Sequence, residues 1–226
     1  MARYAPLVKV DKNACLPASA VTPEGQPNPG LAPFGGLTPG CRVASEAAAA
    51  GMANAYGRTA CQVVSSDTFC AHAFAYYLPK DQFSLISIPG IGGHRHDFEH
   101  LVVWTKNGAM THASASSHGT LKTKALTDIP SPYRDQTFHA VYVKDHVRTH
   151  GFRFARTGES GNFDARTGFS TLAVVAWDAL PAAARETLNT YDFGAASIKL
   201  KDSRVLNFLN GSGKPLDYPM FTAKAL

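Results

Sequence analysis

Short apolar runs rich in aromatic and β-branched residues dominate the chain from Cys70 onward. Gly, Pro, Asn and Asp separate these runs, as expected for strands that are joined by turns. The six runs are 71–79, 100–105, 109–116, 138–144, 150–156 and 171–177. Several short strands in succession predict a mainly β protein, a two-layer antiparallel β-sandwich.

Helices are predicted outside these strands. Ser45 caps an Ala-rich segment that favours a helix ending near Gly57. Pro181 stands in the first turn of a second predicted helix that runs to Thr190, and a third is expected over 203–210. Residues 17–40 are too rich in Pro and Gly for a helix or a central strand, so we expect a surface loop there.

Composition favours a single folded domain over residues 1–226. Hydrophobic residues make up 45% of the chain and charged residues only 17%, which is enough for one substantial core. No apolar run approaches the roughly 18 residues of a membrane-spanning helix. The net charge of +5 comes from scattered basic residues, so it favours polyanionic surfaces weakly and excludes a nucleic-acid-binding pattern.

The four cysteines, Cys15, Cys41, Cys61 and Cys70, include no Cys-x-x-Cys pair. This spacing argues against a zinc knuckle and favours structural disulfides, for which three pairings exist. Pairing in sequence order would close the loop 17–40 and a short hairpin. Disulfides indicate an extracellular setting, and the alternative is four buried thiols in a cytosolic protein. Because the N-terminus lacks a signal-peptide pattern, we expect the mature form of a secreted protein without its signal.

The segment Gly90–His100 carries the candidate chemistry. Strand alternation places Arg95, Asp97 and Glu99 on one face, with His96, Phe98 and His100 on the other. Two neighbouring carboxylates repel each other and need a counter-charge, which a divalent cation or Arg95 would supply. The glycines before His94 leave its imidazole free to turn toward the carboxylates, and Asp81 ends a neighbouring strand.

Three interpretations of this segment remain open. Oxygen donors with at most one imidazole favour Mg²⁺, Ca²⁺ or Mn²⁺. Zinc held by His94, His96 and His100 is an alternative, although no zinc-protease spacing is present. In the third interpretation, Arg95 forms an ordinary surface ion pair with one of the carboxylates.

The sequence GHRHDFEH at 93–100 resembles the Gly-His-Arg-His-Asp-Trp-Glu heptapeptide of the necrosis- and ethylene-inducing protein-like family of secreted microbial cytolysins. Upstream, AHAFAYYLPKD at 71–81 is similar to the family strand that ends in Pro-Lys-Asp. The likeness continues at 101–104, 117–119 and 177–181, and therefore covers nearly the whole chain.

This resemblance implies an actinoporin- and lectin-like sandwich with two or three peripheral helices and a divalent cation, Ca²⁺ or Mg²⁺, in an acidic cavity. The implied metal ligands are Asp81, His94, Asp97 and Glu99. The ligand cavity would also contain His118, His150, Arg95 and His96. The implied disulfides are Cys15–Cys41 and Cys61–Cys70.

The implied partner is the sugar head group of plant glycosylinositol phosphorylceramide sphingolipids at the membrane surface, where a monomer binds and then damages the membrane. No enzyme activity is expected, because the chain has no Gly-x-Ser-x-Gly elbow and its paired carboxylates share one side of a strand. Phe98 replaces the family's Trp, the segment 82–93 is long, and 144–149 lacks an aromatic residue. A non-cytotoxic, metal-dependent carbohydrate-binding protein is therefore the alternative.

Overall fold

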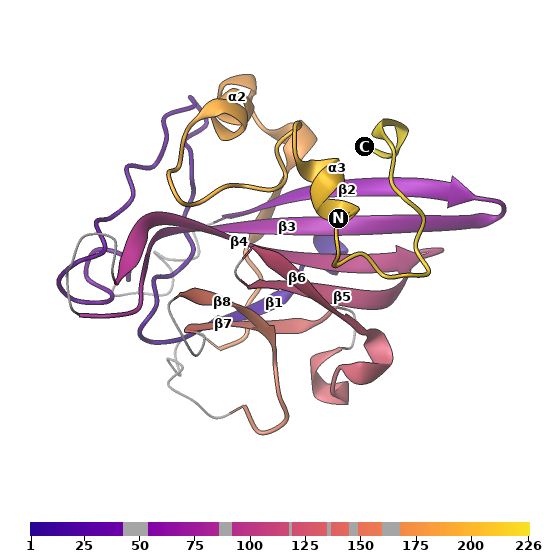
Figure 1. Ribbon diagram of the computed structural model, residues 1–226, viewed down its shortest axis with the longest axis horizontal. Helices are drawn as coiled ribbons and strands as arrows, with labels where there is room; N and C mark the ends of the chain where they lie inside the picture. Colours follow the sequence, from indigo (N-terminus) through magenta and orange to yellow (C-terminus); the bar gives the residue numbers. More distant parts are fainter. Residues whose placement is uncertain (43–53, 86–91, 118, 135–136, 145–148, 160–167) are drawn as a thin grey trace.

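Two β-sheets and a layer of short helices make up the protein (Figure 1). The computed structural model describes residues 1–42, 54–85, 92–117, 119–134, 137–144, 149–159 and 168–226. The larger sheet has the strand order β6-β5-β4-β3-β2-β9. Its strands are β2 (Asn54–Val64), β3 (Asp67–Gln82), β4 (Gly93–Lys106), β5 (Ala109–Ser117), β6 (Thr120–Ala125) and β9 (Ala173–Ala176).

The smaller sheet has the order β1-β7-β8 and packs against one face of the larger sheet. Its strands are β1 (Leu7–Val10), β7 (His139–Lys144) and β8 (His150–Phe154). Buried apolar side chains alternate along β3 and β4, so that Phe74, Leu101 and Val103 meet Tyr142 and Phe152 between the sheets. This inner core confirms the predicted β-sandwich.

The outer face of the larger sheet is covered by the C-terminal part of the chain. Helices α2 (Ala182–Thr190) and α3 (Val205–Leu209) lie on it, as Figure 1 shows above the long strands. Trp104 and Trp177 are fully buried in this second core. The short 3-10 helices are η1 (Ala2–Tyr4), η2 (Leu126–Asp128), η3 (Ser131–Tyr133), η5 (Trp177–Ala179) and η6 (Ala223–Ala225).

Most of the predicted elements are confirmed. Each of the six apolar runs overlaps a strand of the structure, and α2 and α3 lie within the two C-terminal helical predictions. The predicted end of the first helix is wrong, because Asn54 already begins β2 and pairs with Ala173; the rest of that prediction, at 45–53, overlaps residues outside the described ranges. Strands β1, β2 and β6 were not predicted, and β1–β7 and β2–β9 are parallel pairs in a sandwich expected to be antiparallel.

The Pro/Gly-rich segment 17–40 forms no helix or strand, as predicted. It is more than a surface loop, because Ala20 and Val21 are buried in the outer core and Ala18 bridges to Tyr77. The disulfides Cys15–Cys41 and Cys61–Cys70 are both present. Within the described ranges, none of the helices has the length and apolar character needed to cross a membrane.

Removing either disulfide should destabilise the protein, and the loss should grow with the logarithm of the length of the loop that the disulfide closes. By loop-entropy arithmetic, Cys15→Ser/Cys41→Ser should lower the free energy of unfolding by about 3.5 kcal/mol and Cys61→Ser/Cys70→Ser by about 2.5 kcal/mol. Urea unfolding followed by circular dichroism would measure both losses. Equal stability of the two double variants and the wild type would contradict this account.

Candidate functional site

The candidate site lies between the two sheets, where β3 ends and β4 begins. The antiparallel register pairs Asp81 with His94, Leu78 with Asp97 and Tyr76 with Glu99. Asp97 and Glu99 continue the inward-facing series of Leu101 and Val103, so their side chains enter the sandwich rather than solvent. The three carboxylate residues are buried, and each is at most 6% exposed: Asp81, Asp97 and Glu99.

Each of the three buried carboxylates accepts a hydrogen bond from a hydroxyl group. Tyr142 donates from its phenol to Asp97 Oδ2 at 2.8 Å. Thr149 Oγ1 donates to Asp81 Oδ2. Ser116 Oγ donates to Glu99 Oε2 and accepts the backbone N–H of His100 at 2.6 Å. Hydroxyl donors from β5, β7 and the start of β8 therefore fix all three side chains.

Two histidines lie beside Asp81. His150 Nδ1 is 2.6 Å from Asp81 Oδ1, and the backbone N–H of His150 donates to Asp81 Oδ2 at 3.2 Å. His94 Nε2 is 3.7 Å from the same Oδ2, while its Nδ1 is 2.7 Å from the carbonyl oxygen of His96. Asp81 is thus the carboxylate with imidazole partners, and Asp97 and Glu99 have hydroxyl partners.

The hydroxyl and imidazole partners do not fully balance the negative charge of the three carboxylates. Burial, followed by the charge of Asp81, raises the pKa of Asp97 to about 6. Burial and the charge of Asp97 raise the pKa of Glu99 well above its usual value, and the hydrogen bond from Ser116 opposes this only in part. An additional cation near these oxygens would therefore be strongly stabilised.

The donor set fits a hard cation. Three carboxylates and one partly exposed imidazole, His94, offer the oxygen-rich ligands that Ca²⁺, Mg²⁺ and Mn²⁺ prefer. Within the part of the chain that the structure describes, no three His, Cys, Asp or Glu side chains stand close enough together to form a completed ligand set. Occupancy by a metal would accordingly require the carboxylates to turn from their hydroxyl partners toward a common centre.

Arg95 does not share the face of Asp97 and Glu99, and the predicted alternation is wrong at this point. His96 adopts a positive φ of 59°, which breaks the regular alternation of the strand. Arg95 Nη1 donates instead to the carbonyl oxygens of Pro29 and Gly30, at 2.8 and 3.2 Å. The interpretation of the segment as a surface ion pair is therefore wrong.

His96 and His100 lie on the outer face. His96 Nδ1 is 2.7 Å from the Tyr77 hydroxyl. His100 Nε2 accepts the backbone N–H of Lys199 at 2.9 Å, and burial lowers its pKa to about 3. Since neither imidazole turns toward His94, the geometry does not support the zinc alternative. Of the other residues assigned to the ligand cavity, His150 contacts Asp81, and His118 lies outside the described residues.

Tyr142, Thr149 and Ser116 were not predicted as site residues. No local motif marks them, because each reaches the carboxylates from another strand or from the other sheet. The alternation of residues along β7 is a sequence signal for Tyr142, because Ala140 and Tyr142 both face the inner core.

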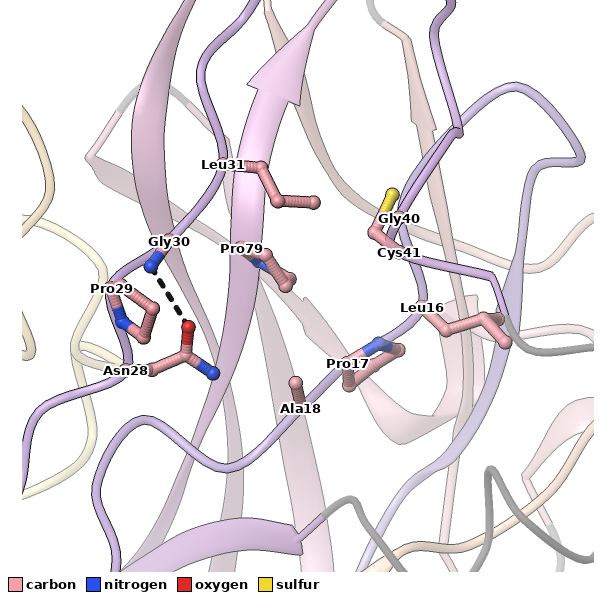
Figure 2. Close-up of a pocket in the computed structure, with 10 residues that line it drawn as sticks. All are labelled: Leu16, Pro17, Ala18, Asn28, Pro29, Gly30, Leu31, Gly40, Cys41 and Pro79. Atoms are coloured by element: carbon pink, nitrogen blue, oxygen red, sulfur yellow. Dashed lines mark hydrogen bonds between the residues drawn. The ribbon is translucent and has the colours of Figure 1, made fainter.

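A separate cavity of about 210 Å³ lies on the outer side of β3, away from the carboxylates. Figure 2 shows it between the Pro/Gly-rich segment and Pro79, with Asn28 Oδ1 accepting the backbone N–H of Gly30 at 2.9 Å. Its wall is largely apolar and contains none of the predicted site residues. It is therefore distinct from the candidate site.

Comparison with known proteins gives matches over most of the chain. The family model described as Necrosis inducing protein (NPP1) matches residues 1–211. NLP effector protein 1 of Phytophthora capsici is 30% identical over 210 residues, covering 89% of this chain and 76% of that protein. Necrosis-inducing protein NPP1 of Phytophthora nicotianae is 27% identical over 219 residues, covering 93% and 79%.

Comparison with solved structures also gives matches over most of the chain. NLPPya in complex with mannosamine is 28% identical with a TM-score of 0.71, and the match covers 92% of this chain and 85% of that one. Non-toxic HaNLP3, 24% identical, has a TM-score of 0.72 over 92% and 86% of the two chains, a likeness of fold alone.

The raised pKa of Asp97 predicts a pH dependence of stability in chelator-treated protein. In the folded state Asp97 binds its proton up to about pH 6, whereas in the unfolded chain it releases the proton near pH 3.8, the ordinary pKa of an Asp side chain. The folded state therefore binds more protons in this window, and stability falls as the pH rises from about 4 to 6, by up to ~1.4 kcal/mol per pH unit.

Urea unfolding at several pH values would measure this fall. Asp97→Asn should reduce the slope between pH 4 and 6, because the amide does not titrate, and the slope that remains belongs to Glu99, whose pKa is also raised. Asp178→Asn, at an exposed position, should keep the wild-type slope. A parallel fall in the Asp97→Asn variant would show that Asp97 is not the group responsible.

Proposed function

Because the chain belongs to the necrosis-inducing protein (NPP1) family, we propose that it is a secreted cytolysin that binds sugar head groups of plant plasma-membrane sphingolipids and then damages the membrane. The family resemblance drawn from GHRHDFEH is thereby confirmed, whereas the lipid, the metal and the membrane damage belong to the proposal. The head groups meant are those of glycosylinositol phosphorylceramides, approached by a monomer from the extracellular side.

The buried carboxylate cluster carries this proposal. Asp81, Asp97 and Glu99, together with His94, would hold a divalent cation, Ca²⁺ or Mg²⁺, and Mn²⁺ has compatible chemistry. Such an ion, when bound, would offer coordination positions to neighbouring hydroxyl groups of a hexose. Related NLPPya structures in complex with mannosamine and with glucosamine support a sugar as the ligand of this scaffold.

The neighbouring side chains favour binding over catalysis. Ser116 is buried and uses its hydroxyl proton on Glu99, so it is not prepared as a nucleophile. Asp97 and Glu99 project from the same side of β4 and do not flank a space for a scissile bond. We therefore propose that the protein binds its sugar without cleaving a bond, with His150 orienting Asp81.

A non-cytotoxic, metal-dependent carbohydrate-binding protein is the second candidate function. The observation that favours it is the sequence KDHVRT at 144–149, which offers no aromatic side chain for insertion into a membrane. This candidate shares the metal and the sugar with the first and differs only in leaving the membrane intact.

Replacing a carboxylate by an amide tests whether cation binding depends on the carboxylate cluster or on the protein's acidic residues in general. Asp81→Asn and Asp97→Asn should each weaken Ca²⁺ and Mg²⁺ binding by at least about 100-fold, because a ligand oxygen loses its charge. The matched control is Asp67→Asn, which removes a carboxylate that pairs with Lys106 at the other end of β3. Calorimetric titration of chelator-treated protein measures all three. Normal binding by Asp97→Asn would overturn the proposed metal site.

Dye release distinguishes the two candidate functions. Vesicles that contain plant glycosylinositol phosphorylceramide should leak with wild-type protein and divalent cation, and leakage should fall to background with Asp97→Asn or with chelator. Vesicles of phosphatidylcholine alone are the lipid control. Cation-dependent binding without leakage would instead establish the carbohydrate-binding candidate.

A further inference from the structure

Two large apolar side chains are exposed at the end of β3 that also carries Asp81. Phe34, in the Pro/Gly-rich segment, is 64% exposed, and Leu85, just after β3, is 67% exposed. Figure 1 shows the N-terminal loop segment at the left, at this same end of the long strands, opposite the β2–β3 turn at the right. We call Phe34 and Leu85 the apolar rim.

A buried polar network holds both parts of the rim together. Gln82 Nε2 donates to the carbonyl oxygen of Gly35 and to that of Ser84, both at 3.0 Å, and these residues are the direct neighbours of Phe34 and Leu85. Lys80 Nζ donates to Gly36 O at 2.9 Å and to Gln82 Oε1 at 2.7 Å. One pair of side chains thus fixes two segments that are about fifty residues apart in sequence.

This network places the rim beside the carboxylate cluster. Lys80 and Gln82, each 3% exposed, bind the loop, while Asp81 between them binds Thr149 and His150. The alternation of a β-strand turns adjacent side chains to opposite faces, so one strand end serves both features. The rim and the carboxylate cluster are therefore both bonded to the end of β3.

Exposed cations accompany the rim. Lys144 Nζ donates to the carbonyl oxygen of Phe83 at 3.0 Å, and Arg95 pairs in register with Lys80. Both Lys144 and Arg95 are exposed. Apolar side chains flanked by cations are typical of surfaces that contact anionic membranes.

We propose that the apolar rim enters the lipid surface of an anionic membrane and brings the carboxylate cluster to the head groups. This inference rests on the proposed function and adds the residues that contact the acyl region. A second copy of the chain is the weaker occupant, because a stable dimer buries about 800 Å² on each partner, far more than two side chains offer. A bilayer needs only such anchors together with cations.

Vesicle sedimentation tests the rim. Phe34→Ser and Leu85→Ser should each weaken binding to phosphatidylcholine vesicles containing plant glycosylinositol phosphorylceramide by about tenfold, and the double variant by more. The matched control is Val63→Ser, since Val63 is 63% exposed but lies at the β2–β3 turn. Unchanged binding by Phe34→Ser and Leu85→Ser would overturn the inference.

Titrations with Ca²⁺ and with free glucosamine distinguish a failure of the rim inference from a failure of the proposed function. The rim variants should match the wild type in both titrations while losing vesicle binding. If the wild type does not bind vesicles containing the sphingolipid, the proposed function fails, and the rim is tested with phosphatidylserine vesicles. A tenfold loss of binding to those vesicles by the rim variants still supports the rim inference. Unchanged binding overturns the rim inference.

Tryptophan reporters give a direct measure of insertion. Phe34→Trp and Leu85→Trp should gain fluorescence that brominated lipids quench, and Val63→Trp should gain fluorescence that they do not quench. Absence of quenching at 34 and 85 would overturn the inference. Conversion of a dimer to a monomer by Phe34→Ser in sedimentation velocity, with vesicle binding unchanged, would also overturn it and assign the rim to self-association.

Discussion

The burial of three carboxylates between two sheets is the constraint on which the candidate site depends. A buried carboxylate is costly unless hydrogen bonds and opposite charge compensate it. Here Tyr142, Thr149 and Ser116 each give one hydrogen bond, and His150 adds an imidazole at Asp81. The remaining excess of negative charge appears in the raised pKa values of Asp97 and Glu99. The proposed cation would balance this excess, which the site's own side chains do not.

The backbone at His96 turns the Arg95 side chain away from the three carboxylates. A positive φ at a residue other than glycine costs about 1–3 kcal/mol, and the contacts to Tyr77 and Phe193 hold His96 in place. Gly30 packs so closely that a Cβ there would stand 2.6 Å from the His96 ring. The turn sends Arg95 outward to the Pro/Gly-rich segment, so the carboxylates lack the guanidinium that regular alternation would have given them.

Local sequence patterns predicted the individual strands and helices better than the way in which the strands pair. The apolar runs predicted strands, and Pro181 predicted α2, because periodicity and capping are properties of the neighbouring residues. The parallel strand pairs β1–β7 and β2–β9 join segments more than a hundred residues apart, which no local pattern encodes. Likewise Asp81, His94, Asp97 and Glu99 could be selected from the sequence by spacing and resemblance, whereas the hydroxyl partners depend on how the sheets pack.

The end of β3 joins the proposed sugar site to the proposed membrane contact. Asp81 belongs to the buried cluster, and its neighbours Lys80 and Gln82 bind carbonyl oxygens of the loop that carries Phe34. A head group held at the carboxylates would then lie at a fixed distance from the exposed apolar side chains. The missing aromatic at 144–149 does not by itself remove the means of membrane contact, because Leu85 and Phe34 are exposed apolar side chains at the same edge. Affinity for the sugar and affinity for the bilayer would add through this rigid connection, as for two binding modules joined by a short linker.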